Sequence, residues 1–146
     1  MPETDPYQPD NIFAKILRGE IPCHKVLEDD FVLAFMDVMP QADGHTLVIP
    51  KLPLRGLIDM PDDAWGPYMA RVRKVALAVK EGMQAEGLNL RQFDGAAGGQ
   101  TVFHLHFHII PRWAGVSLRR HGEGMEKPDV LKANSERIRA ALQALG

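Results

Sequence analysis

The chain has little of what marks several protein classes. It has one cysteine among 146 residues, which excludes an internal disulfide framework and fits a reducing compartment. No apolar run is long enough to cross a bilayer. The formal net charge is only −2, so no strong basic surface is present to attract nucleic acid. The first six residues are acidic and polar, unlike a signal peptide. We therefore expect a cytoplasmic protein with no nucleic-acid and no membrane partner.

The composition fits one globular domain. Apolar residues make up 45% of the chain and charged residues 25%, which is ordinary for a domain of this length. Residues 1–9 contain three prolines and little to bury, so we expect a flexible N-terminal arm. Residues 10–146 should then form one domain.

The most informative stretch runs from residue 95 to residue 113. His104, His106 and His108 alternate with apolar residues, and this period of two predicts a half-buried strand with three imidazoles on one face. A glycine-rich segment comes directly before them, and glycine lets backbone approach a ligand closely. Imidazoles beside such a loop favour a phosphate ligand.

Two chemistries compete for these histidines. Two imidazoles can share a metal ion, but the third lies roughly 13 Å along the strand from the first, and Cys23 is the only thiolate the chain offers. The alternative is nucleophilic catalysis, in which a neutral imidazole attacks phosphorus while its neighbours position the anion. Histidines that merely pack or face solvent would rarely fall in this register.

The segment from His104 to Ile110 resembles the histidine triad (HIT) signature, in which three histidines alternate with apolar residues. Residues 11–16, 20–22, 34–37 and 44–51 are also similar to segments of that family, in the family's order. The resemblance covers about residues 10–115 and implies a HIT-like domain. The short strands, hairpins and single long helix favour the same α+β class, an antiparallel sheet of about five strands with helices on one side and shorter terminal helices.

Local signals predict where the elements lie. A short helix should be capped by Asp10 and end near Arg18, and a long helix should open at Pro61. A C-terminal helix is expected over residues 130–145. The expected strands cover residues 23–28, 31–37, 45–50 and 88–93 and the histidine segment.

The resemblance implies a site for a purine nucleotide of the AMP type. Asp37 would accept the hydroxyls of the ribose, although an acidic residue before Pro40 also suits a turn. Thr101 and the backbone around Gly99 and Gln100 would hold the phosphate, and His45 would support the triad. The residues expected around the base are Ile12, Phe13, Ile16, Phe35, Val38 and Leu47.

The central position of His106 makes it the expected nucleophile, and attack at the α-phosphorus would give a nucleotidyl-histidine intermediate. A backbone carbonyl should bind its other nitrogen, while His108 and His104 position the phosphate or orient His106. The leading function is an adenosine phosphoramidase that needs no cofactor. A dinucleoside polyphosphate hydrolase, a nucleotide-binding interaction protein with weak turnover and, more distantly, a metal-binding module are the alternatives.

Two departures from the family matter. Many bacterial members carry a Cys-x-x-Cys pair that helps to bind structural zinc, and Asn11 and Ala14 occupy those positions here. His45 and His104 alone would make a poor closed site, so we predict no metal. Phe93 replaces a usual asparagine or glutamine and cannot donate a hydrogen bond, which affects selection of the leaving group. The resemblance also implies a homodimer, with the tail near Trp113 approaching the partner's site.

Overall fold

The computed structural model describes residues 6–120 and 122–146. Its helices and strands follow in the order α1 (Ile12–Leu17), β1 (Lys25–Glu28), β2 (Val32–Met36), β3 (Thr46–Pro50), η1 (Leu57–Asp59), α2 (Asp62–Gly82), β4 (Gly87–Arg91), η2 (Ala96–Gly98), β5 (Phe107–Arg112) and α3 (Pro128–Ala144). The two short 3₁₀ helices, η1 and η2, were not predicted. Both precede the segment that carries the histidines.

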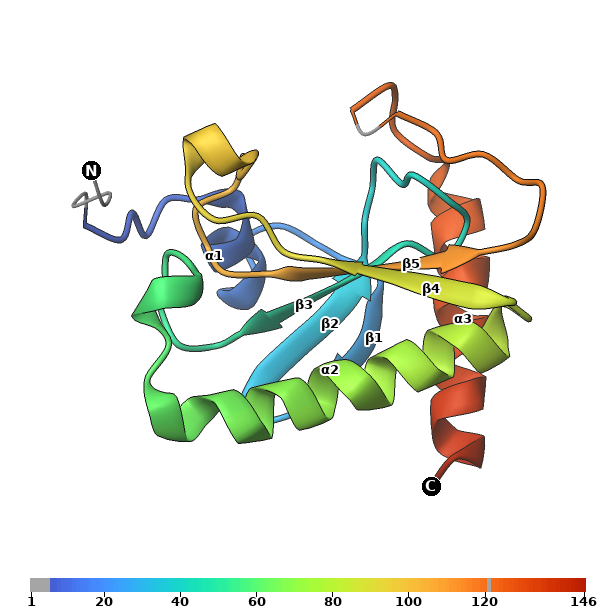
Figure 1. Cartoon of the computed structure of the whole chain (residues 1–146), viewed down its shortest axis with the longest axis horizontal. Helices are drawn as coiled ribbons and strands as arrows, with labels where there is room; N and C mark the ends of the chain where they lie inside the picture. Colours follow the sequence, from blue (N-terminus) through green and yellow to red (C-terminus); the bar gives the residue numbers. More distant parts are fainter. Residues whose placement is uncertain (1–5, 121) are drawn as a thin grey trace.

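The five strands form one sheet in the order β1-β2-β3-β5-β4 (Figure 1). Every neighbouring pair is antiparallel, which confirms the predicted α+β class. The strand predicted over the histidines begins only at Phe107, so His104 and His106 precede it. The reason is that β3 ends at Pro50, and the N–H of Leu105 donates instead to the carbonyl of Leu54 at 2.9 Å.

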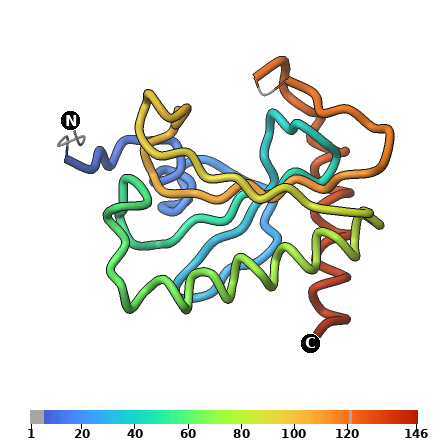
Figure 2. Tube along the Cα trace, viewed as in Figure 1, coloured from blue at the N-terminus to red at the C-terminus, as the bar shows by residue number. Residues whose placement is uncertain are grey.

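The two faces of the sheet are covered by different helices. Alternate strand residues such as Val32 and Val48 pack with α2 and α3 in one core. Their neighbours Leu33 and Leu47 pack with Phe13 of α1 in a second core. The expectation that all helices lie on one side is therefore wrong, because α1 covers the face opposite to α2. Figure 2 traces these segments from α1 in blue to α3 in red.

The N-cap of the first helix lies one residue later than predicted. Asn11, rather than Asp10, is the N-cap, and its side-chain oxygen accepts the N–H of Ala14 at 2.9 Å. Such a bond satisfies one of the free donors in the first turn. Of the predicted flexible arm, residues 1–5 lie outside the described residues, and residues 6–9 lead to this cap. Within the described chain, no helix combines the length and apolar character needed to span a bilayer.

Candidate active site

The loop before the histidines is held together from inside. The buried side chain of Gln100 accepts the N–H of Gly95 at 2.8 Å and donates to the carbonyls of Arg55 and Val102 at 2.8 and 3.0 Å. The N–H groups of Gly99 and Gln100 donate to carbonyls within the same loop. These two groups are therefore not presented to a phosphate in this structure. Thr101 comes next, and its side chain is exposed.

The ring of His106 has a defined proton position. Its Nδ1 lies 2.7 Å from the backbone carbonyl oxygen of His104. A carbonyl only accepts, so Nδ1 carries the proton, and the Nε2 of the neutral ring keeps its lone pair. This is the carbonyl contact that the nucleophile hypothesis requires. The ring is also packed edge-to-face against Phe13 and His108, with centroids 4.9 and 5.0 Å away.

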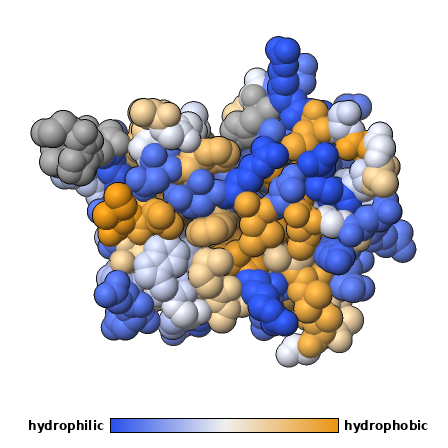
Figure 3. Space-filling view, in the orientation of Figure 1, coloured by the Kyte–Doolittle hydropathy of each residue, from blue (hydrophilic) through white to orange (hydrophobic). Residues whose placement is uncertain are grey.

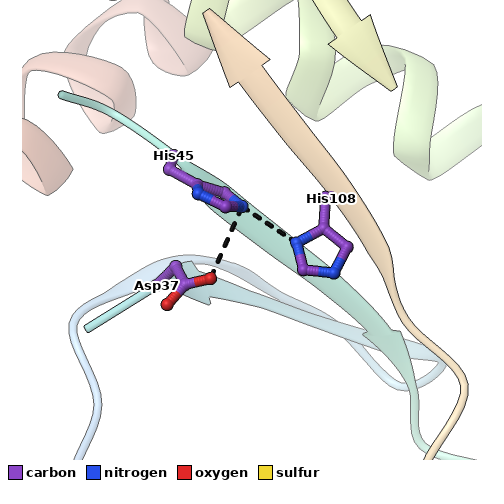
Figure 4. Close-up of side chains that lie close together, drawn as sticks. All are labelled: Asp37, His45 and His108. Carbon is purple, nitrogen blue, oxygen red and sulfur yellow. Dashed lines mark hydrogen bonds and ion pairs between the residues drawn. The ribbon is translucent and has the colours of Figure 1, made fainter. Parts of the chain in front are cut away.

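His108 has the opposite arrangement, which is set by His45. The N–H of Gln41 donates to Nδ1 of His45 at 3.0 Å, so the proton of that neutral ring is on Nε2. This Nε2 lies 2.9 Å from Nδ1 of His108, which therefore accepts (Figure 4). The neutral ring of His108 then carries its proton on Nε2. A nitrogen with a lone pair on His106 and an N–H donor on His108 thus occur on adjacent rings.

Asp37 belongs to the same cluster. Its carboxylate is buried, with Oδ1 accepting the N–H of Met39 at 2.9 Å and Oδ2 lying 3.4 Å from Nε2 of His45 (Figure 4). The expected acceptor of the ribose hydroxyls therefore already contacts the backbone and a buried imidazole.

Asp37, His45 and His108 are also the one group in the described chain whose ligand atoms fit a metal ion, all within 4.8 Å of one another. Two imidazoles and a carboxylate are a zinc-type ligand set. For Nε2 of His45 to bind a metal ion, it would have to lose the proton that it donates to Nδ1 of His108. The predicted lack of a metal stays a prediction.

His104 is fully buried and has a partner at each ring nitrogen. Its Nε2 lies 2.7 Å from the carbonyl oxygen of Pro50, and its Nδ1 lies 2.6 Å from the hydroxyl of Tyr7. Burial lowers the pKa of His104 to about 4, against a weaker opposite effect of the Pro50 carbonyl. The positions of the family's cysteine pair hold the helix cap Asn11 and the buried Ala14, which has no ligand atom. The residues do not fit a structural zinc site of that kind.

An apolar cluster lies on the histidine side of the sheet. Four predicted base contacts come together there: Phe13, Ile16, Phe35 and Leu47. Ile12 and Val38 lie outside this cluster, with 46% and 37% of their surfaces exposed. Val102 packs against the cluster and was missed, although an apolar residue between Thr101 and the histidines is a usable signal. A pocket of about 490 Å³ opens beside it, between residues 6–12, Arg55 and residues 101–103.

Phe93 takes part in the site by packing. Its ring meets that of His108 edge-to-face, with centroids 5.6 Å apart. Gly99 has a φ of +98°, and a methyl group on it would lie 3.3 Å from Cδ1 of Phe93. The phenyl ring thus fills the space between the glycine-rich loop and the third histidine. This contact explains how an apolar residue is accommodated where a hydrogen-bonding one was expected.

Comparison with known proteins shows what the chain is similar to. A model of the HIT domain matches residues 18–115. The adenylylsulfatase HINT3 of Arabidopsis thaliana is 40% identical over 131 residues, which are 86% of this chain and 66% of that protein. The crystal structure of a HIT-like protein involved in cell-cycle regulation from Bartonella henselae has a TM-score of 0.86 and 50% identity, and covers 93% of this chain and 99% of that one. A zinc-bound histidine triad family protein from Mycobacterium smegmatis has a TM-score of 0.82 and 36% identity, over 93% and 95% of the two chains.

Proposed function

Because this chain belongs to the HIT family, we propose that it is a hydrolase of purine nucleotide conjugates. It cleaves at the α-phosphate, and its preferred substrates are adenosine phosphoramidates. The observation that carries this proposal is the pair of tautomers on adjacent rings. His106 offers a lone pair on Nε2 and His108 offers an N–H donor, with ring centroids 5.0 Å apart. Attack on phosphorus and stabilisation of its oxygens require these two states together.

The reaction proceeds in two displacements. Nε2 of His106 forms a bond to the α-phosphorus while the bond to the leaving group breaks, and the leaving amine takes a proton from solvent. The N–H of His108 and the hydroxyl of Thr101 bind the non-bridging oxygens, while the contacts of Asp37 with His45 and of His45 with His108 hold the ring of His108 in its orientation. Water then attacks the nucleotidyl-histidine, releases AMP and restores the neutral ring.

The nucleoside occupies the apolar cluster next to the triad. Phe13, Ile16, Phe35 and Leu47 pack on the base, while the exposed Ile12 and Val38 form its rim. Apolar walls with a few placed polar groups are typical of small-ligand sites. Asp37 meets the ribose through the edge of the carboxylate that faces away from His45. Backbone contacts of Gly99 and Gln100 with the phosphate would require the loop to open, so Thr101 is the main contact.

A second candidate differs only in the leaving group. HINT3, a relative with 40% identity, is an adenylylsulfatase, and hydrolysis of an adenylyl sulfate uses the same attack at the α-phosphorus. Diadenosine polyphosphates would also be cleaved at that bond. Phe93 provides no hydrogen bond with which to choose between these groups.

The deciding experiment compares turnover of an adenosine phosphoramidate, adenylyl sulfate and a diadenosine polyphosphate by the natural protein. We expect the highest kcat/KM for the phosphoramidate. Mass spectra of enzyme quenched rapidly without acid should show an adduct of AMP on His106, because the bond between phosphorus and the ring nitrogen is acid-labile. A preference for another conjugate changes the substrate and keeps the mechanism. An adduct-free enzyme that binds AMP without turnover would instead identify an interaction protein.

We also propose a homodimer, formed through the edge strand β4. Leu90 of β4 and Leu77 of α2 are exposed, and Figure 3 shows hydrophobic side chains gathered over this side of the molecule. Trp113, expected near the partner, packs against the core of its own chain and donates to the carbonyl of Gln84 at 3.0 Å, and its contact with a partner stays a prediction. Sedimentation of Leu90→Lys against the natural chain tests the interface, and an unchanged dimer would place it elsewhere.

A further inference from the structure

An N-terminal tyrosine reaches the buried end of the triad. Tyr7 precedes α1 and is half-buried, and its hydroxyl lies 2.6 Å from Nδ1 of His104, 97 residues along the chain. Their rings also meet edge-to-face, with centroids 5.6 Å apart and an interplanar angle of 75°. A residue in a proline-rich segment with no periodic pattern gives no signal of this contact in the sequence.

The direction of this hydrogen bond follows from the other side of the ring. The Nε2 of His104 lies 2.7 Å from the carbonyl oxygen of Pro50, so Nε2 must donate. The Nδ1 of the neutral ring then has a lone pair, and the hydroxyl of Tyr7 donates to it. With both nitrogens engaged and the ring fully buried, His104 is held in one orientation and one tautomer.

His104 connects this contact to the proposed nucleophile. Its backbone carbonyl accepts from Nδ1 of His106 at 2.7 Å, and that bond leaves the lone pair on Nε2 of His106. We propose that Tyr7 is a positioning residue for His106, because it fixes the His104 ring and with it the carbonyl that sets the tautomer of His106. The expected effect of Tyr7 on the reaction rate rests on the proposed function. Its expected effect on the tautomers of His104 and His106 concerns the free protein and does not depend on that function.

Loss of the hydroxyl would leave a buried acceptor without a donor, which a folded protein avoids by rearrangement or by binding water or a proton. The groups that face the His104 ring are the Tyr7 ring, the Pro50 carbonyl and the imidazole of His106. Rotation of the ring would pull Nε2 from Pro50 and shift the attached backbone. Proton uptake at Nδ1 would put a positive charge beside His106. Either change reduces the population of His106 that is ready to attack.

The test is Tyr7→Phe, which keeps the ring contact and removes only the hydroxyl. We expect kcat to fall about tenfold, while KM and the Kd for AMP stay within twofold, because Tyr7 acts through His104 and not on the nucleotide. In the free protein, ¹⁵N NMR of the histidine side chains should show a shifted Nδ1 of His104 and a mixed tautomer for His106.

The matched control is Tyr68→Phe, since Tyr68 is the only other tyrosine. Its hydroxyl donates to the carbonyl of Val48 at 2.7 Å from the opposite face of the sheet. This variant should unfold at a lower temperature with an unchanged kcat and unchanged histidine spectra. An unchanged kcat and unchanged spectra in Tyr7→Phe, or the same loss in both variants, would overturn the inference. Full activity of His106→Ala would refute the proposed function instead, and the NMR result would still decide the role of Tyr7.

Discussion

The two faces of the sheet bury their side chains in different ways. The face under α2 and α3 is a continuous apolar core, where Tyr68 bonds to a backbone carbonyl. The face under α1 combines a smaller apolar cluster with buried polar side chains that bond to one another or to backbone. The first face provides stability through area removed from water. The second depends on exact partners, because a buried polar group without one is costly.

One strand connects the two environments. In β5, Ile109 is fully buried on the α2 side, while the preceding His108 lies on the site side opposite Leu47 of β3. Successive residues of a strand point to opposite faces, so His108 is held by a backbone that the apolar core fixes, and His106 directly precedes this strand. The face with the smaller apolar cluster can therefore hold buried polar side chains, because the apolar core on the other face stabilises the strand. Variants that separate the two contributions test this division.

The largest effect should come from His106→Ala. We expect turnover of the phosphoramidate to fall by roughly a thousandfold or more, because the nucleophile is lost and no other step replaces it. The chain should stay folded, with a moderate fall in the free energy of unfolding because the carbonyl of His104 loses its partner, and it should keep much of its affinity for AMP. Stopped-time assays, urea unfolding and calorimetry measure the three quantities. EDTA treatment of the natural enzyme should leave turnover unchanged, and a requirement for added zinc would contradict this mechanism.

The converse variant is Ile109→Ala, in the strand β5 that directly follows His106, on the face opposite to the histidines. Removal of a fully buried isoleucine side chain from the core should lower the free energy of unfolding by about 2–5 kcal/mol. The folded fraction should keep nearly the natural kcat, since the imidazoles face the other way. Urea unfolding and active-site titration separate these quantities. A loss of kcat as large as that of His106→Ala would show that the faces are not independent.

The same comparison explains what the sequence could reveal. Alternation and helical periodicity come from burial of single faces, so four strands and the helices α2 and α3 were predicted in their places. The fifth strand, β5, was predicted over all three histidines but begins only at Phe107. The cap at Asn11 and the side covered by α1 depend on tertiary packing, and both were predicted wrongly. The triad was predicted from its alternation with apolar residues and from the family resemblance, which also suggested Asp37 and His45, and the roles of these residues stay predictions.

The partners of these groups were harder to predict. The donor to His45 is the backbone N–H of Gln41 and the acceptor for His104 is the carbonyl of Pro50. Every residue has nearly the same backbone groups, so composition and spacing do not indicate which of them bonds to a given histidine. Only the general requirement that a buried imidazole be satisfied at both nitrogens predicts that such partners exist.

A pH titration tests the contribution of a single residue of the polar face, His104, to the free energy of unfolding. Burial lowers the pKa of His104 to about 4 from its ordinary value of 6.5, so the unfolded chain binds the proton first as the pH falls. The contribution of His104 is therefore complete above pH 6.5 and is lost between pH 6.5 and 4, for a total of about 3 kcal/mol. Urea unfolding at several pH values, compared with His104→Asn, isolates it. Equal slopes for the two proteins would exclude a neutral buried His104.

The smallest effect should come from Gly99→Ala, in the loop that leads to Thr101. The φ of +98° is strained for any residue with a Cβ, and the new methyl group would meet Cδ1 of Phe93 at 3.3 Å. We expect a loss of about 1–2 kcal/mol in the free energy of unfolding. Gly98→Ala is the matched control, because its methyl group would meet nothing within 4 Å. Combining Gly99→Ala with Phe93→Leu should recover the part of the loss that is due to contact and leave the backbone strain. Equal stabilities of the two alanine variants would show that the loop can adopt another backbone conformation. They would also show that the contact of Phe93 with Gly99 does not hold the loop in place beside His108.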